Sequence, residues 1–144
     1  MRHQGGWGGV LASGLGTTCG LRSDGSPVCW GLDEDEFSES VARYRQISIS
    51  IAHFCGVTLD GEIHCRNRWA DESPISGHSF VQVSTGESSE CGLTQDGEIH
   101  CFGTITLPRR LEGVFQTLSC SGDNCCALRD NGKVACWGDM ARGL

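Results

Sequence analysis

The strongest constraint on this chain is a short motif that occurs four times in one register. Each copy begins with a cysteine, has Asp-Gly or Asn-Gly near its middle, and carries a second cysteine ten positions after the first. The leading residues are Cys19, Cys55, Cys91 and Cys126, so the period is 36, 36 and 35 residues. A fixed period of this length is typical of repeat architectures, in which each copy forms one supersecondary unit. We therefore expect a row of four equivalent units.

Each copy is expected to form a β-hairpin, because short alternating segments flank its Asp-Gly or Asn-Gly pair. If residues 23–25 form a three-residue loop with Gly25 in the left-handed region, Cys19 faces Cys29 as a non-hydrogen-bonded pair. The Cβ atoms of such a pair approach closely enough for a disulfide. The equivalent turn glycines are Gly25, Gly61, Gly97 and Gly132.

The hairpin register predicts four equivalent disulfides, which leaves Cys120 and Cys125 for a fifth. The four pairs are Cys19–Cys29, Cys55–Cys65, Cys91–Cys101 and Cys126–Cys136. A free or metal-binding thiol set at Cys120, Cys125 and Cys126 is the alternative. A reducing cytosol rarely maintains a ten-cysteine disulfide framework. We therefore expect an extracellular or secreted location, although residues 1–10 lack the apolar core of a signal peptide.

The repeat also extends upstream of each leading cysteine. An aliphatic residue lies eight positions before it, and the last three copies have an aromatic residue three positions earlier, namely Tyr44, Phe80 and Phe115. About 36 residues are enough for four short strands, as in a propeller blade. We predict one repeat domain over residues 1–144. Its repeats are expected at about 8–43, 44–79, 80–114 and 115–144, with residues 1–7 as a lead segment.

The balance of charge argues against nucleic acid as a partner. Lys and Arg number 11 against 18 Asp and Glu, which gives a formal net charge of -7. Affinity for a phosphate backbone comes largely from Lys and Arg, so this balance is unfavourable. No apolar stretch approaches the roughly 20 residues that a membrane-spanning helix needs. We therefore expect neither nucleic-acid binding nor direct membrane contact.

The motif Cys-Gly-Leu, two residues, Asp-Gly, three residues, Cys-Trp-Gly resembles the repeats of the RCC1 and β-lactamase-inhibitor-protein-II superfamily of β-propellers. Its cysteine-bearing form is similar to the ectodomains of plant crinkly-type receptor kinases and to bacterial secreted repeat proteins. The resemblance covers about residues 8–138 and implies an all-β, RCC1-like propeller with one blade per repeat. Copy two departs from the motif with Arg66 and Asn67, and copy three with Phe102.

Four repeats are fewer than the seven blades usual in propellers of this type. The chain could be a partial propeller, it could associate with a second chain through open blade edges, or it could close a small ring. In the last case residues 1–7 would complete the blade that the final repeat leaves short. These three alternatives remain open from the sequence.

Candidate residues for chemistry are few, and we expect no catalytic residue, metal or cofactor. The five histidines are His3, His53, His64, His78 and His100. His64 and His100 occupy equivalent repeat positions, which favours a structural role; zinc on reduced His and Cys neighbours is the alternative. The acidic run at residues 33–36 is interpreted as a solvated loop. Trp30 and Trp137 belong to the repeat and are expected in the core.

The function expected of such a chain is noncatalytic recognition of a protein partner. A rigid repeat scaffold displays variable loops at one rim, and the most polar of these loops are residues 31–43 and 67–79. The alternatives are a secreted enzyme inhibitor similar to the lactamase-inhibiting relatives and, less favoured, a metal-binding or redox protein that uses reduced Cys and His.

Overall fold

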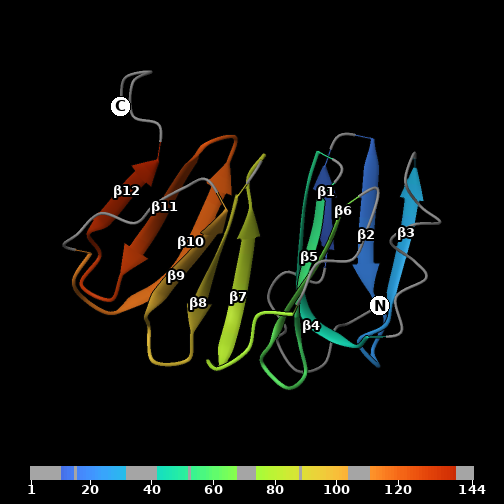
Figure 1. The fold of residues 1–144 in the computed structure, drawn as a ribbon, viewed down its shortest axis with the longest axis horizontal. Helices are drawn as coiled ribbons and strands as arrows, with labels where there is room; N and C mark the ends of the chain where they lie inside the picture. Colours follow the sequence, from blue (N-terminus) through green and yellow to red (C-terminus); the bar gives the residue numbers. More distant parts are fainter. Residues whose placement is uncertain are drawn as a thin grey trace.

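The computed structural model describes residues 11–14, 16–31, 42–51, 53–67, 74–87, 89–103 and 111–138. In these residues the chain forms four three-stranded antiparallel sheets, one for each repeat (Figure 1). The strands are β1 (Leu11–Gly14), β2 (Thr17–Leu21), β3 (Pro27–Gly31), β4 (Tyr44–Ser50), β5 (His53–Thr58), β6 (Ile63–Asn67), β7 (Phe80–Thr85), β8 (Ser89–Thr94), β9 (Ile99–Gly103), β10 (Phe115–Ser121), β11 (Asn124–Arg129) and β12 (Val134–Gly138). The all-β, four-blade propeller class is confirmed. No described residue lies in a helix that could span a membrane.

The first strands of successive blades contact one another, and the third strand of each blade lies at the opposite edge of its sheet; we call them the inner and outer strands. Strands β1, β4, β7 and β10 are successive neighbours, whereas β3 and β12 lie at opposite ends of the view (Figure 1). The repeat length is enough for four short strands per blade. The described residues contain three per blade, and a single bridge between Ile63 and Ile75 occupies the fourth-strand place in blade two.

The Asp-Gly and Asn-Gly turns set the register of the hairpins. In blade one the Arg22 amide donates to the Ser26 carbonyl and the Gly25 amide donates to the Arg22 carbonyl, both at 2.9 Å. The turn glycines all have positive φ, 86° for Gly25, Gly61 and Gly132 and 87° for Gly97. This conformation suits glycine because it lacks a Cβ atom. Cys19 is therefore the direct partner of Cys29 across β2 and β3.

Disulfides join the second and third strands of all four blades. The bridges are Cys19–Cys29, Cys55–Cys65, Cys91–Cys101 and Cys126–Cys136, with Cα–Cα distances of 4.0 to 4.1 Å. A fifth bridge, Cys120–Cys125, joins β10 to β11 in blade four. The disulfide-stapled hairpins expected of this fold are thus present in the structure.

The glycine after the leading cysteine makes room for the aromatic residue at the start of the blade. A Cβ atom on Gly92 would lie 2.8 Å from two carbons of the Phe80 ring, and one on Gly56 would lie 2.7 Å from Cε1 of Tyr44. Both rings are fully buried. The aromatic side chain therefore packs directly on the backbone of the second strand, which explains the Cys-Gly pair of these copies.

Two residues of blade one are exposed although their counterparts in other repeats are buried. Ile47, Val83 and Leu118 are buried, but Leu11 is 68 % exposed because β1 has no earlier blade against it in the described part of the chain. Trp137 is 3 % exposed, whereas Trp30 is 52 % exposed on the outer strand β3. The expectation of a core position is therefore wrong for Trp30: Trp137 packs against residues of blade three, whereas blade one has no preceding blade in the described part of the chain.

The expected repeat boundaries stay a proposal. Strands β4, β7 and β10 begin at Tyr44, Phe80 and Phe115, the residues from which we count the second, third and fourth repeats. The expected pairing of residues 1–7 with the last blade lies outside the residues that the structure describes. His3 and the acidic run 33–36 also lie outside them.

Candidate functional site

Successive blades are joined at the rim that carries the hairpin turns. The carbonyls of the first three turn glycines each accept a hydrogen bond from the first residue of the next blade. The bonds are Tyr44 N to Gly25 O at 2.8 Å, Phe80 N to Gly61 O at 2.9 Å, and Phe115 N to Gly97 O at 3.0 Å. One glycine in each of the first three repeats therefore shapes the turn and also anchors the following blade.

Glutamine side chains make a second connection between the inner strands. Gln46 on β4 donates from Nε2 to the Val83 carbonyl at 3.0 Å and accepts from the Val83 amide at 2.7 Å. One repeat later, Gln82 on β7 accepts from the Leu118 amide at 3.1 Å. These bonds pair side-chain atoms of one blade with the backbone of the next, so blades two, three and four are held in a fixed relation.

The serines two positions after the glutamines extend this connection. The Ser48 hydroxyl accepts from the Thr85 amide at 3.1 Å, and the Ser84 hydroxyl accepts from the Cys120 amide at 2.8 Å. Equivalent positions in blade four are Thr117 and Ser119, both of which are exposed. The inner strand of blade four thus carries polar side chains at the same positions. Among the described residues, no following blade packs against them.

We call the surface formed by the hairpin turns and by residues 42–43, 74–79 and 111–114 the turn rim; it is the lower edge in Figure 1. Acidic residues recur in its turns, at Asp24, Asp60, Asp96 and Asp130. Leu59 and Val114 add exposed apolar side chains, at 45 % and 48 % exposure. The loops 31–43 and 67–79 reach this rim with their last residues; residues 32–41 and 68–73 lie outside the described part.

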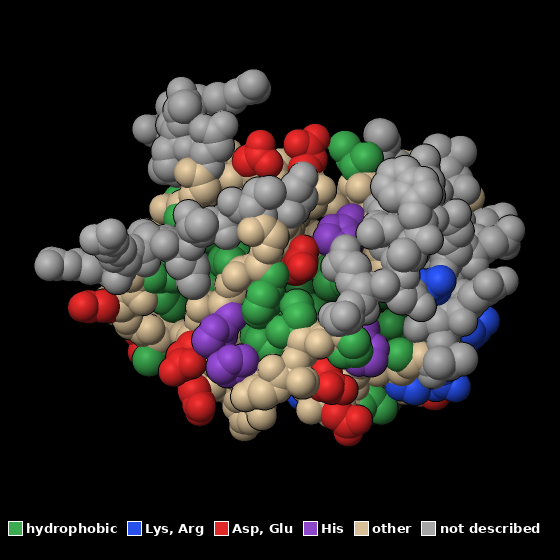
Figure 2. Space-filling view, in the orientation of Figure 1, with side chains coloured by type: hydrophobic (Ala, Val, Ile, Leu, Met, Phe, Trp, Pro, Cys, Tyr) green, Lys and Arg blue, Asp and Glu red, His purple; other side chains and the backbone are tan. Residues whose placement is uncertain are grey.

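Blade three has a shallow hollow of about 270 Å³ on the turn rim. It is lined by polar residues of the β8–β9 turn and of the segment before β7, among them His78, Asp96 and Glu98. His78 stacks on His100 with ring centroids 4.0 Å apart, and His100 Nε2 lies 3.4 Å from Glu98 Oε2. Figure 2 shows histidine side chains next to acidic ones on this face. The repeat pattern predicts that His100 lies on a strand, but no sequence pattern predicts its contact with His78.

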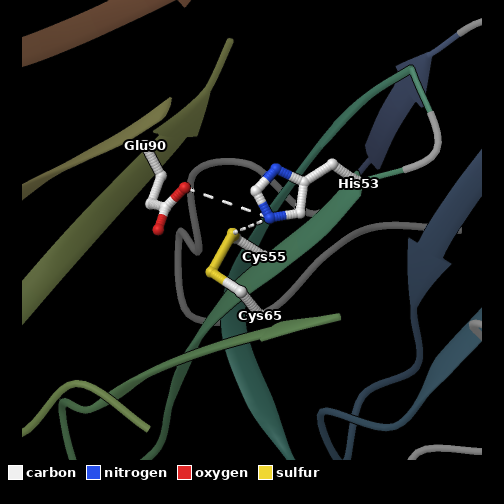
Figure 3. Close-up of side chains that lie close together, drawn as sticks. All are labelled: His53, Cys55, Cys65 and Glu90. Carbon is white, nitrogen blue, oxygen red and sulfur yellow. Dashed lines mark hydrogen bonds and ion pairs between the residues drawn. A yellow bond between two sulfur atoms is a disulfide. The ribbon is translucent and has the colours of Figure 1, made fainter. Parts of the chain in front are cut away.

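A buried polar cluster lies between blades two and three (Figure 3). His53 Nε2 on β5 is 3.9 Å from Glu90 Oε2 on β8 and 3.9 Å from Cys55 Sγ. Both His53 and Glu90 are 7 % exposed. Cys55 is bonded to Cys65, so its sulfur is not a thiolate ligand in this oxidised form. The cluster is therefore an interblade contact in the oxidised protein.

The cysteines of blade four lie against the disulfide of blade three. Cys125 Sγ is 3.5 Å from Cys91 Sγ, and both residues are buried. Cys120, Cys125 and Cys91 have the spacing of a metal-ligand group, but each is already part of a disulfide. None of the ten cysteines is free, so a site of reduced thiols requires prior reduction.

Asp24, in the β2–β3 turn of blade one, has a pKa that departs clearly from the ordinary value for aspartate. The Ser26 hydroxyl, 2.6 Å from Asp24 Oδ1, and the Ser26 amide at 2.9 Å both donate to this carboxylate and lower the pKa of Asp24. Arg43 Nε, 3.9 Å from Asp24 Oδ2, contributes to the same shift. The carboxylate thereby stabilises the turn and connects it to the start of blade two.

Comparisons with known proteins agree with this architecture. A model of the Regulator of chromosome condensation (RCC1) repeat matches residues 115–143. No curated protein sequence matches the chain. Among solved structures, the CRINKLY WD40 ectodomain of the Arabidopsis thaliana receptor kinase ACR4 is 25 % identical, with a TM-score of 0.79 over 90 % of this chain and 52 % of that one.

Two further structures share the fold. The entire ectodomain of the Physcomitrella patens receptor kinase CR4 is 23 % identical, with a TM-score of 0.72 over 89 % of this chain and 38 % of that one. Prp20p of Saccharomyces cerevisiae is 15 % identical, with a TM-score of 0.64 over 89 % and 43 %. The chain thus spans about half or less of the length of these structures. The resemblance to RCC1-type repeats and crinkly-type ectodomains is confirmed, and the four blades have the RCC1-like propeller architecture.

Proposed function

We propose that this chain is a noncatalytic protein-recognition module of an extracellular or secreted protein, and that its turn rim contacts the partner. The observation that carries this proposal is the rigid connection of the rim. Every described blade junction has a turn-glycine bond, and every blade has a disulfide. A surface fixed in this way loses little conformational freedom on binding, which favours affinity.

The rim also differs from blade to blade, as a specific surface requires. The equivalent turn positions hold Ser23, Leu59, Gln95 and Asp130, all of them exposed. Fixed positions with varied side chains allow a repeat scaffold to distinguish partners.

The solved relatives support the class of function. One structure shows Kap60 bound to yeast RCC1 (Prp20), and Prp20p of Saccharomyces cerevisiae binds Gsp1p and histones. The two plant structures are receptor-kinase ectodomains. Five disulfides and this similarity support an oxidising, extracellular location for our chain. The net charge of -7 makes a protein partner more favourable than nucleic acid.

The proposal is tested with oxidised protein in a binding panel of secreted proteins and receptor ectodomains. We expect saturable binding of a panel member, lost in Leu59→Asp on the turn rim and retained in Ile51→Asp. Ile51 is a matched control because it is also an exposed apolar residue of blade two, at 51 %, but lies in the β4–β5 turn at the opposite rim. Binding that Leu59→Asp leaves intact and Ile51→Asp abolishes would move the site to the other rim and contradict the proposal.

A further inference from the structure

We propose that His78, Glu98 and His100 form a zinc-binding site on the turn rim of blade three. This inference goes beyond the proposed recognition function and does not depend on it. One ligand atom from each residue lies within 4.8 Å of the other two. Two imidazoles and a carboxylate are ligands that Zn²⁺ commonly takes, and three protein ligands leave one position open for water.

The backbone around the site holds the three residues in place. The Gln95 amide donates to the Ser79 carbonyl at 2.8 Å, which fixes the segment that carries His78 to the turn that carries Glu98. The Glu98 amide donates to the Thr94 hydroxyl at 3.1 Å. His100 lies on β9 opposite Gly92, so no side chain on that partner residue competes for the space beside its ring.

The aromatic contacts bring the two imidazoles together before any metal binds. The rings of His78 and His100 are stacked with an interplanar angle of 29°, and the Phe80 ring lies edge-on to both, at 5.6 Å and 6.1 Å. A metal ion must lie near the plane of each imidazole that binds it, so at least one ring has to rotate out of the stack. His78 is exposed and has room for this rotation.

The distances between the ligand atoms are close to those required around a zinc ion. Two ligand atoms at about 2.1 Å from a tetrahedral zinc ion are about 3.4 Å apart. His100 Nε2 and Glu98 Oε2 already have this separation, 3.4 Å. Rotation of the exposed His78 ring brings the third ligand nearer. Asp96 also lines the hollow and adds negative charge that favours a cation. Two imidazoles favour zinc over calcium, which prefers oxygen ligands.

Blade two provides an internal comparison. Its Glu62 and His64 form the equivalent pair, with Oε1 and Nε2 3.6 Å apart, but Ala42 stands where blade three has His78. In blade four the equivalents of Glu98 and His100 are Lys133 and Ala135. Among blades two to four, only blade three has the complete set of ligands.

The test is a titration of the oxidised protein with Zn²⁺, followed by calorimetry and by NMR of the histidine side-chain nitrogens. We expect one site per chain, with shifts confined to His78 and His100. His78→Ala, which gives blade three the residue of blade two, should weaken binding at least about tenfold, as should Glu98→Gln. His64→Ala is the matched control and should leave affinity unchanged.

Two results would overturn the proposal. One is zinc binding of equal affinity in the wild type and in His78→Ala; the other is the absence of any shift of the His78 and His100 nitrogens at millimolar zinc. The second readout uses the unaltered protein, so it does not depend on the folding of a variant. Intact mass under nonreducing conditions verifies that each variant keeps five disulfides.

Discussion

Gln46 and Val83 form a two-bond connection across the boundary between blades two and three. The glutamine side chain donates to the Val83 carbonyl and accepts from the Val83 amide, at 3.0 and 2.7 Å. Gln46 is 8 % exposed, so water has little access to these bonds. The geometry resembles one rung of a β-ladder in which a side chain replaces the neighbouring strand. This connection fixes blade three against blade two and leads to the first prediction.

Gln46→Met is expected to lower the free energy of unfolding by about 2 kcal/mol or more, because it leaves two buried backbone groups without partners. Gln82→Met is the matched control. Gln82 is half-buried and accepts from only one backbone amide, so we expect a loss of about 1 kcal/mol. Urea unfolding measures both values. Hydrogen exchange of the Val83 amide should accelerate in Gln46→Met only, and equal exchange in both variants would contradict this assignment.

Turn glycines with the same φ should differ in their tolerance of alanine. Gly132→Ala meets no atom within 4 Å, so its cost is the left-handed conformation alone, about 1–2 kcal/mol. Gly97→Ala has the same strain, and its Cβ would also lie 2.5 Å from Val114 Cγ1 and 3.1 Å from the Phe115 amide nitrogen. We expect Gly97→Ala to be the more destabilising in thermal unfolding. Equal losses would show that the turn of blade three can move away from blade four.

A peptide map can test whether the blade-four cysteines are bonded only to one another. Digestion of the nonreduced protein with trypsin and Asp-N separates the peptides that carry Cys120, Cys125 with Cys126, and Cys136. The pairs Cys120–Cys125 and Cys126–Cys136 predict that these three peptides remain linked to one another. Cys91 should stay with Cys101, although its sulfur is 3.5 Å from that of Cys125. A Cys91–Cys125 peptide or alkylatable thiols would contradict the expected pairing.

Ala42→His should create a second zinc site. This change supplies blade two with the histidine that blade three already has, next to Glu62 and His64. We expect the zinc stoichiometry to rise from one to two per chain in calorimetry. Because protons and zinc compete for imidazole nitrogen, both sites should weaken as the pH is lowered. Ala42→Ser, which adds no ligand nitrogen, is the control and should keep one site.

The turn of blade one should contribute a pH-dependent stabilisation. Hydrogen bonds from Ser26 lower the pKa of Asp24. The carboxylate therefore stabilises the fold above the ordinary aspartate pKa of about 3.9, and this contribution is lost as the pH falls through the lowered value. Ser26→Ala should raise the pKa of Asp24 towards its ordinary value, measured by NMR titration of the carboxyl carbon. Ser23→Ala, in the same turn, should not change it.

The hairpins could be predicted from sequence because their determinants are local. The position of Gly25 in the turn sets the partner of every residue on β2 and β3, and the same count applies from Gly61, Gly97 and Gly132. The β-propeller class could be predicted from the repeat period of 36, 36 and 35 residues. The candidate binding loops could be located but not described in detail, because only their final residues belong to the described structure.

Contacts between blades were not visible in the sequence. Gln46 bonds to the backbone of Val83, and a backbone acceptor leaves no residue type by which a sequence could identify the pair. His78 and His100 belong to different ends of one repeat, and only the return of the chain to the turn rim stacks them. The burial of Trp137 and the exposure of Trp30 likewise depend on whether a preceding blade packs against them.

The sequence by itself thus determined the repeat, the register of each hairpin and the places where cysteines face one another, because each depends on chain distances of about ten residues. The tertiary structure decided how the blades are joined, which equivalent residues are buried and where the imidazoles meet carboxylates. These features depend on the angle and separation of whole sheets, and such quantities are fixed only when the aromatic and aliphatic side chains of adjacent blades pack against each other.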